Sequence, residues 1–177
     1  MTSLELEGYQ SGREFDCSIG DVTGRIDPGM VEAAPLQRGL ALWRSLAGDR
    51  LFPGRSQMSP RALGGLLRNT ILIKVLDEGA EFQVRIIGDV IRAIDPDAWQ
   101  GLTTREMDAR LPGHGANLRA VYGHACTHKA PLAFRGLFRR KADGWTFHRE
   151  HLLLPLGESD DAVDHLISLI VIIQPDI

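Results

Sequence analysis

Cysteine is scarce in this sequence, whose 177 residues include only Cys17 and Cys126. Two cysteines do not make a disulfide framework, and their spacing matches no metal-binding motif. The simplest interpretation is a pair of reduced thiols in a cytoplasmic protein. Long hydrophobic runs are also missing, because the longest, Leu166 to Ile173, has the length of a strand and is interrupted by Ser168. The sequence therefore predicts no membrane span, and its N-terminus lacks the pattern of a signal peptide.

A strong excess of one charge is missing too, since the formal net charge is -3. Nucleic-acid-binding proteins usually carry a clear basic surface, so this balance argues against a nucleic-acid partner. One local basic group, Arg135 with Arg139, Arg140 and Lys141, is interpreted as a solvated hairpin, with phosphate or partner binding as the alternative. The composition, 44% apolar and 24% charged, is that of an ordinary globular protein.

Catalytic and phosphate-binding motifs are absent: the sequence has no Walker loop, Rossmann fingerprint, nucleophile elbow or HExxH motif. Among its six histidines, His124 and His128 lie four residues apart in a predicted helix, so both can point the same way and share a metal. A third ligand, such as His114 or His151, would have to come from elsewhere. Histidines at the helix surface or at the edge of the core are the simpler interpretation. We therefore predict no metal ligand and no catalytic residue.

The last third of the chain is organised around three predicted antiparallel strands. Leu132 to Phe138 and Trp145 to Leu156 flank a charged connection that ends in Asp143-Gly144, a dipeptide typical of hairpins. A polar turn over residues 157–161 leads to the almost wholly apolar run Val163 to Ile173. Such a run is typical of a central strand that is buried on both faces.

Upstream of these strands the patterns alternate between helix and strand. Pro35 to Ala47 is the first convincing helix, and a shorter one is predicted over Pro60 to Leu67. Thr70 to Leu76 and Glu81 to Ile87 indicate a second hairpin. Short helices follow, of which Asn117 to His128 is the longest.

The domain organisation follows from this order of elements. Residues 1–34 show no periodicity and are interpreted as an N-terminal arm, and residues 35–177 as a single domain. Runs of strands separated by a helical block predict an α+β fold around one antiparallel sheet.

Several short stretches carry a resemblance to a known family through their order and spacing. They are Leu40, Leu42 and Trp43 in the first helix, Leu51-Phe-Pro-Gly-Arg-Ser56, Pro60, Phe82-Gln-Val-Arg-Ile-Ile-Gly88, Gly101-Leu-Thr103 and Leu153-Leu-Pro-Leu-Gly157. Together they resemble PAS domains, and more specifically a family of small stand-alone bacterial PAS-like proteins. The resemblance covers Pro35 to Ile173. It implies a five-stranded antiparallel sheet in the order 2-1-5-4-3, with short helices on one face and an N-terminal helix.

PAS domains are sensory and interaction modules, so the resemblance implies a non-catalytic signalling function through a small ligand, a protein partner or both. It keeps haem open, because some PAS domains bind haem through a histidine on their long helix. A flavin-binding PAS domain would have a cysteine in an Asn-Cys-Arg-Phe-type motif, and Ala125-Cys-Thr-His128 departs from that motif. The cofactor is therefore unknown. The alternative function is a small enzyme that uses His151 or His128 as acid or base.

The expected ligand site lies between the sheet and the helix Asn117 to His128. An apolar wall with few polar groups is typical of a small-molecule site and equally of a solid core, so both interpretations stay open. The predicted ligand-binding residues are Ile86, Ile91, Met107, Leu118, Val121, Tyr122, Ala125, Phe134, Phe147 and His151.

Association is predicted from the helix Pro35 to Ala47. Its apolar stripe of Leu36, Leu40 and Trp43 must be buried somewhere, which predicts a homodimer through this helix. No output domain follows the last predicted strand, so we expect the protein to act through a partner or through self-association.

Overall fold

The computed structural model describes residues 24–94, 99–139 and 146–173. Six strands form one antiparallel sheet in the order β1-β4-β5-β6-β2-β3. The strands are β1 (Gly24–Ile26), β2 (Thr70–Leu76), β3 (Glu81–Ile87), β4 (Leu132–Arg139), β5 (Thr146–Leu156) and β6 (His165–Ile173). The α-helices are α1 (Ala34–Ala47), α2 (Pro60–Leu63), α3 (Asp89–Ile94), α4 (Thr104–Arg110) and α5 (His114–His128). The 3-10 turns are η2 (Pro28–Met30), η3 (Gly64–Asn69) and η4 (Asp77–Gly79).

The α+β prediction is confirmed, and so is the relative order of the five predicted strands, which are β2 to β6 here. The strand count is corrected from five to six. The sixth strand, β1, comes from the stretch that was interpreted as an arm, and it pairs with β4, with Arg25 opposite Phe134. The boundary after residue 34 stays a prediction, but the described part of the proposed arm is attached to the sheet.

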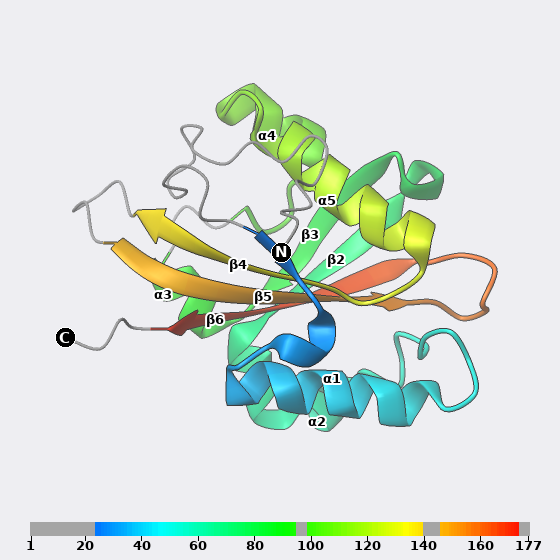
Figure 1. The fold of residues 1–177 in the computed structure, drawn as a ribbon. Coiled ribbons are helices and arrows are strands. Elements are labelled where there is room, and N and C mark those ends of the chain that lie inside the picture. Colours follow the sequence, from blue (N-terminus) through cyan, green and yellow to red (C-terminus); the bar gives the residue numbers. More distant parts are fainter. Residues whose placement is uncertain (1–23, 95–98, 140–145, 174–177) are drawn as a thin grey trace.

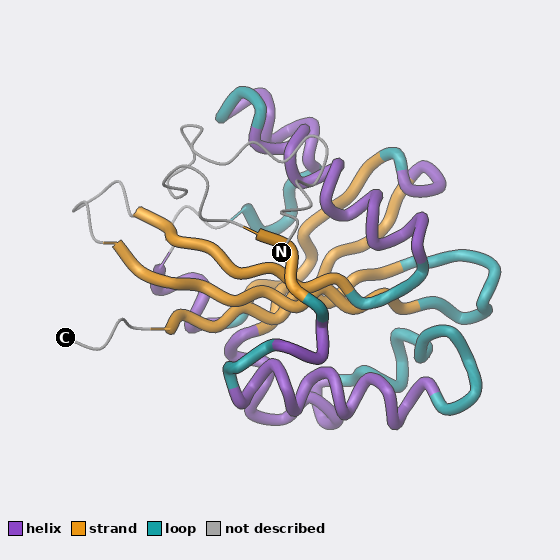
Figure 2. The backbone as a smooth tube through the Cα atoms, in the orientation of Figure 1, coloured by secondary structure: helices purple, strands orange, loops and turns teal. Residues whose placement is uncertain are grey.

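Helices cover both faces of the sheet, as Figures 1 and 2 show: α1 and α2 lie against one face, and α4 and α5 lie across the other. Helix α1 approaches the sheet closely because Gly39 has no side chain, and a Cβ atom there would stand 2.2 Å from Cδ1 of Leu169. The indole Nε1 of Trp43 donates a hydrogen bond of 2.8 Å to the carbonyl oxygen of Pro155 in β5. Leu36, Leu40 and Trp43 are all buried. The apolar stripe that predicted a dimer is therefore covered by the sheet of the same chain.

Glycines explain where two helices differ from their predicted bounds. Helix α2 stops at Leu63, four residues earlier than predicted, because Gly64 has a positive φ of 51° and the chain continues as the 3-10 turn η3. Helix α5 begins at His114, three residues earlier than predicted, directly after Gly113 with a φ of 90°. A positive φ interrupts a right-handed helix, and glycine adopts it without steric cost.

A β-bulge decides which way the end of β3 faces. The pairing of β2 with β3 passes from Leu72↔Ile86 to Ile73↔Val84, which leaves Arg85 as an extra residue. An extra residue reverses the alternation beyond it. Ile87 is consequently buried, whereas Ile86 is 39% exposed. The expected inward placement of Ile86 is therefore wrong.

The centre of the sheet is buried on both faces. The apolar run predicted as a central strand is β6, which lies between β5 and β2, and every residue from Glu150 to Leu156 in β5 is buried. Pro155 lies near the end of β5, beyond the start of its neighbour β4. The predicted Asp143-Gly144 turn lies outside the described residues. Among the helices of the described ranges, none combines the length and the apolar character that crossing a bilayer requires.

Candidate functional site

The candidate site is the layer between α5 and the sheet. Leu169 of β6 contacts α1, so Ile170, the next residue, points to the opposite face, where α5 lies. His151 is the direct cross-strand partner of Ile170 and shares that face. The side chains of β5 and β6 that point to this face form the floor of the site, and α5 forms its roof.

Two aromatic contacts belong to this layer. The ring of Tyr122 on α5 meets Phe82 of β3 edge to face, with the ring centroids 5.3 Å apart. On the floor, Phe134 of β4 stacks on the imidazole of His151 at 4.4 Å between centroids. These two residues are also direct cross-strand partners. Such a stack fixes the orientation of the imidazole.

Two titratable side chains of β5 share this floor, the half-buried Arg149 and the buried His151, which has 7% of its surface exposed. Burial lowers the pKa of His151 well below the usual value, and the neighbouring positive charge of Arg149 lowers the pKa further. The imidazole is therefore neutral at physiological pH. A neutral, oriented imidazole can form hydrogen bonds in this layer without adding a charge of its own.

The structure brings most of the predicted ligand-binding residues into this layer. Val121, Tyr122 and Ala125 are the buried face of α5, and Phe134 belongs to the same apolar cluster. Met107 and Ile91 form a second cluster with Ile170, and the half-buried Leu118 packs against both clusters. The exceptions are Ile86, which the bulge turns outward, and Phe147, whose side chain lies outside the described part of the chain.

Three wall residues were not predicted as part of the site: Phe82, Val84 and Ile170. Phe82 packs on Tyr122, and Val84 and Ile170 join the cluster of Met107. The alternation in β3 would have found Phe82 and Val84, because both precede the bulge. Ile170 stands in a run of apolar residues, which carries no signal for one face or the other.

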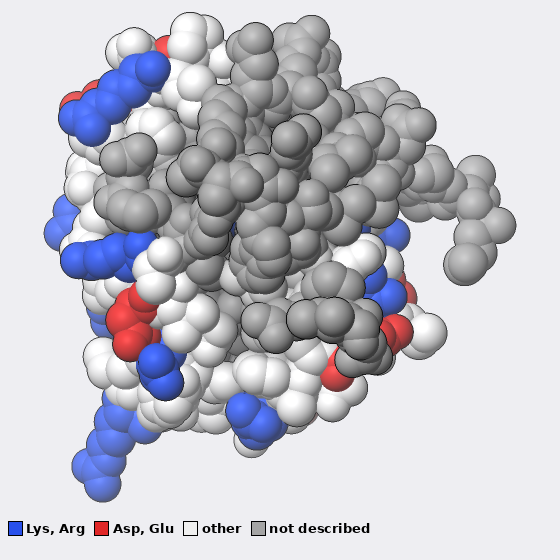
Figure 3. Space-filling model, turned by 90° about the vertical axis from the view of Figure 1, so that its left-hand side faces the viewer, with Lys and Arg blue, Asp and Glu red and all other residues white. Residues whose placement is uncertain are grey.

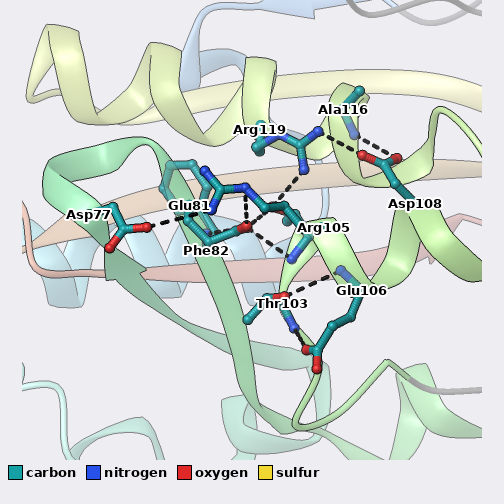
Figure 4. A network of polar contacts seen from close by, with 10 residues as sticks. Asp77, Glu81, Phe82, Thr103, Arg105, Glu106, Asp108, Ala116 and Arg119 are labelled. Carbon is teal, nitrogen blue, oxygen red and sulfur yellow. Dashed lines mark hydrogen bonds and ion pairs between the residues drawn. The ribbon is translucent and has the colours of Figure 1, made fainter.

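A polar network fixes the start of α4 on β3, as Figure 4 shows. The buried carboxylate of Glu81 accepts hydrogen bonds from the hydroxyl and, at 3.1 Å, from the amide of Thr104. Its other oxygen lies 3.1 Å from Nε of Arg105. Burial alone would raise the pKa of Glu81, but the hydrogen bonds from Thr104 and the Phe82 amide, with the nearby Arg105 and Arg119, lower it overall. The carboxylate thus stays ionised and holds α4 in place.

The same network joins α4 to α5. Nη2 of Arg119 donates to Oδ2 of Asp108 at 2.6 Å, and its Nη1 donates to the hydroxyl of Thr104 at 3.2 Å. Oδ1 of Asp108 accepts the amide of Ala116 at 3.0 Å. The helices can meet so closely because Gly115 has no side chain, since a Cβ there would stand 1.6 Å from the carbonyl oxygen of Thr104. These groups satisfy one another, so their role is to position the roof of the site.

The two histidines considered as metal ligands form a contact of a different kind. The rings of His124 and His128 stack with their centroids 3.9 Å apart, and Nη1 of Arg25 lies 3.2 Å from Nε2 of His124. Burial lowers the pKa of His124, and the nearby charges of His128 and Arg25 lower it further. His114 is ten residues earlier on α5, about 15 Å along the axis, and packs beside Trp99. In the ranges that the structure covers, no cluster of three histidine, cysteine or acidic side chains is placed to hold a metal ion.

Cys126 also lies on α5, and burial raises the pKa of its thiol to about 12. A thiol with such a pKa is protonated at neutral pH and is a poor nucleophile.

Comparison with known proteins adds two findings. A family model described as "PAS domain" matches residues 31–171. Among solved structures, the chain is similar to the PAS domain of an HTR-like protein from Haloarcula marismortui, at 21% identity over 67% of this chain and 95% of that chain, with a TM-score of 0.37. None of the curated proteins that were searched matches the chain.

Proposed function

Because the chain belongs to the PAS domain family, we propose that this sensory and signalling module is non-catalytic and works by binding a small apolar ligand between α5 and the sheet. The observation that carries the proposal is the composition of that layer. Its walls are apolar and aromatic, and its floor presents the neutral imidazole of His151 beside the half-buried Arg149. Small-molecule sites usually combine such walls with a few placed polar groups.

The alternative function, acid–base catalysis by His151 or His128, has less support. A general base works best when its pKa is near the operating pH. The pKa of His151 is lowered well below that range, which makes it a weak base. Nδ1 of His128 is 2.9 Å from the carbonyl oxygen of His124, on the exposed side of α5. His128 therefore does not belong to the proposed ligand layer.

A protein partner is the second part of the proposal, and a second copy of the chain in the cytoplasm is one candidate. The apolar stripe of α1 no longer supports this homodimer, because Leu36, Leu40 and Trp43 are buried on the sheet. A second copy that used this helix would have to bind its outward side, where Arg38 and Arg44 are exposed. Sedimentation at high protein concentration tests the homodimer, and a monomer under those conditions would exclude it.

The ligand proposal is tested by filling the layer. Ala125 is 1% exposed and lies on the inward face of α5. In a solid core, Ala125→Phe should destabilise the protein by about 1–3 kcal/mol through overpacking. In a layer with room for a ligand, the added ring should cost little stability and abolish retention of the ligand.

The measurements are urea unfolding and native mass spectrometry with an absorbance spectrum of freshly purified protein. The matched control is Ala41→Phe, which adds the same ring to the exposed side of α1 and should change neither result. A bound small molecule that is present in the wild type and in the control but absent from Ala125→Phe supports the proposal. Strong destabilisation together with no bound molecule in the wild type would leave a module that acts through protein partners alone.

A further inference from the structure

The layer formed by α1, α2, η3 and their connecting loop has an unusual charge. Between Ala34 and Asn69 the sequence contains six arginines, no lysine and a single acidic residue, Asp49. The formal charge of this layer is therefore +5, in a chain whose net charge is -3. The six arginines are Arg38, Arg44, Arg50, Arg55, Arg61 and Arg68.

Two of these arginines have partners within the fold. Arg50 donates to the carbonyl oxygen of Gly157 at 2.8 Å and lies 3.5 Å from the carboxylate of Asp160. Arg68 forms an exposed ion pair with Asp89 at 3.2 Å. These two guanidinium groups are accounted for by contacts that hold neighbouring elements together.

The other four arginines, which we call the basic face, are Arg38, Arg44, Arg55 and Arg61. Within the described ranges, none of their guanidinium groups makes a hydrogen bond or an ion pair. Arg38, Arg44 and Arg61 are exposed, and Arg55 is half-buried. In Figure 3, arginine and lysine side chains stand out along the lower edge of the described surface, the end of the molecule at which α1 and α2 lie in Figure 1.

The chemistry of the basic face selects a partner that is rich in carboxylates. A guanidinium group binds a carboxylate through two parallel hydrogen bonds, and arginine is enriched over lysine in protein contacts. Insertion into a membrane would also need apolar residues on the outward side of α1. Leu36, Leu40 and Trp43 instead point inward. A carboxylate-bearing peptide segment is therefore the favoured partner.

The chain carries such a segment at its own N-terminus. Residues 1–23 contain five acidic side chains and one arginine, which gives a formal charge of -4. The acidic residues are Glu5, Glu7, Glu14, Asp16 and Asp21. We propose that the basic face is a docking surface for residues 1–23 of the same chain, held by carboxylate–guanidinium pairs.

Length and tethering make this contact feasible. The segment joins the described structure at Gly24, the first residue of β1. Twenty-three extended residues span up to about 75 Å, whereas a folded chain of this size has a radius of gyration of about 15 Å. Because the segment is tethered, its effective concentration at the basic face is in the millimolar range. Weak, exposed ion pairs suffice at that concentration. The docked segment would also cover the outward surface of α1, so it would compete there with any acidic partner or second copy.

A paramagnetic probe tests the contact in the full chain. Cys17 lies in the acidic segment, whereas the thiol of Cys126 is largely buried with a pKa of about 12, so a nitroxide can be attached selectively to Cys17. At low salt the probe should broaden the amide signals of Arg38, Ala41 and Arg44. The broadening should be lost at about 1 M salt, where the Debye length is about 3 Å.

Two triple variants of equal charge provide the comparison. Arg38→Gln with Arg44→Gln and Arg61→Gln should abolish the broadening of the α1 amides. Arg85→Gln with Arg92→Gln and Arg110→Gln, three exposed arginines on other elements, should leave it unchanged. Absence of broadening in the wild type at low salt would overturn the proposal, and so would equal effects of the two triple variants.

Two further samples test whether the contact lies between two molecules and whether it depends on the position of the probe. A mixture of nitroxide-labelled chains without ¹⁵N and unlabelled chains with ¹⁵N detects contacts between molecules. Broadening of the α1 amides in this mixture would show docking by the segment of a second copy and would overturn the proposal of a contact within one chain. Moving the probe to Ser11→Cys in a Cys17→Ser background should reproduce the wild-type pattern, and a different pattern would refute docking of the segment.

Discussion

Glu150 should contribute strongly to stability, because its carboxylate joins three parts of the fold. The side chain is fully buried in β5. Its oxygens accept the amide of Ala33 at 2.8 Å and the amide of Glu32 at 3.0 Å, directly before α1. They also accept Nε of Arg135 on β4 at 2.9 Å and a second bond from its Nη2. We predict that Glu150→Gln, which keeps the shape and removes the charge, is strongly destabilising.

The magnitude follows from these contacts. Removing one partner of a buried ion pair costs about 3–5 kcal/mol. The loss here should lie at or below the lower end of that range, because the side chain of Arg135 is 33% exposed and keeps the carboxylate of Glu32 at 3.2 Å. We therefore expect a loss of about 2–3 kcal/mol in the free energy of unfolding. Urea titration followed by tryptophan fluorescence measures it, with Glu78→Gln, an exposed substitution, as the matched control.

The loss should also depend on pH in a defined direction. Burial raises the pKa of Glu150, but the hydrogen bonds from Ala33, Arg135 and Glu32 outweigh burial, so the pKa in the folded protein is below 4.5. The stabilisation is therefore complete above pH 4.5 and is lost as the pH falls through the folded-state pKa. The difference between wild type and Glu150→Gln should be constant near neutral pH and shrink in acid. A loss below about 1 kcal/mol at pH 7, or a difference that grows in acid, would refute this reasoning.

Three further predictions concern the helices. Gly39→Ala should cost about 1–3 kcal/mol in urea unfolding, because the new Cβ meets Leu169. The double variant Gly39→Ala with Leu169→Ala should lose less than the sum of the two single losses. Trp43→Phe should cost about 1–2 kcal/mol by leaving the carbonyl oxygen of Pro155 without its indole donor. The sedimentation of this variant should equal that of the wild type. A change in oligomeric state would contradict the inward placement of Trp43. In a variant whose only thiol is Cys126, a disulfide reagent should react slowly at pH 8 and quickly in denaturing urea, whereas fast reaction of the folded protein would contradict its raised pKa.

The sequence predicted the sheet well wherever patterns were local. The bounds of β2 and β3 and the central position of β6 could be predicted, because alternation, β-branched residues and an apolar run are properties of the strands themselves. Strand β1 could not be predicted. Its three residues, Gly24 to Ile26, have no pattern of their own and become a strand through pairing with β4.

The candidate site could be predicted in part for the same reason. Helical spacing identified Val121, Tyr122 and Ala125 as the inward face of α5. Ile86 was misplaced, because a bulge is set by the pairing of two strands and leaves no signature in either one. The burial of Glu150 was also beyond prediction, since the amide groups that make it tolerable come from residues more than a hundred positions away.

The pairing of β4 with β5 has a consequence for how the chain reaches a unique fold. Phe134 stacks on His151 on one face, and their neighbours Arg135 and Glu150 pair on the other. A slip of one residue between these strands would turn the side chains of the slipped strand to the opposite face. If β4 slipped, Arg135 would lie in the apolar layer under α5 without Glu150, and Phe134 would lie at the start of α1 without His151. Two neighbouring pairs of opposite character thus make a one-residue slip costly on both faces at once.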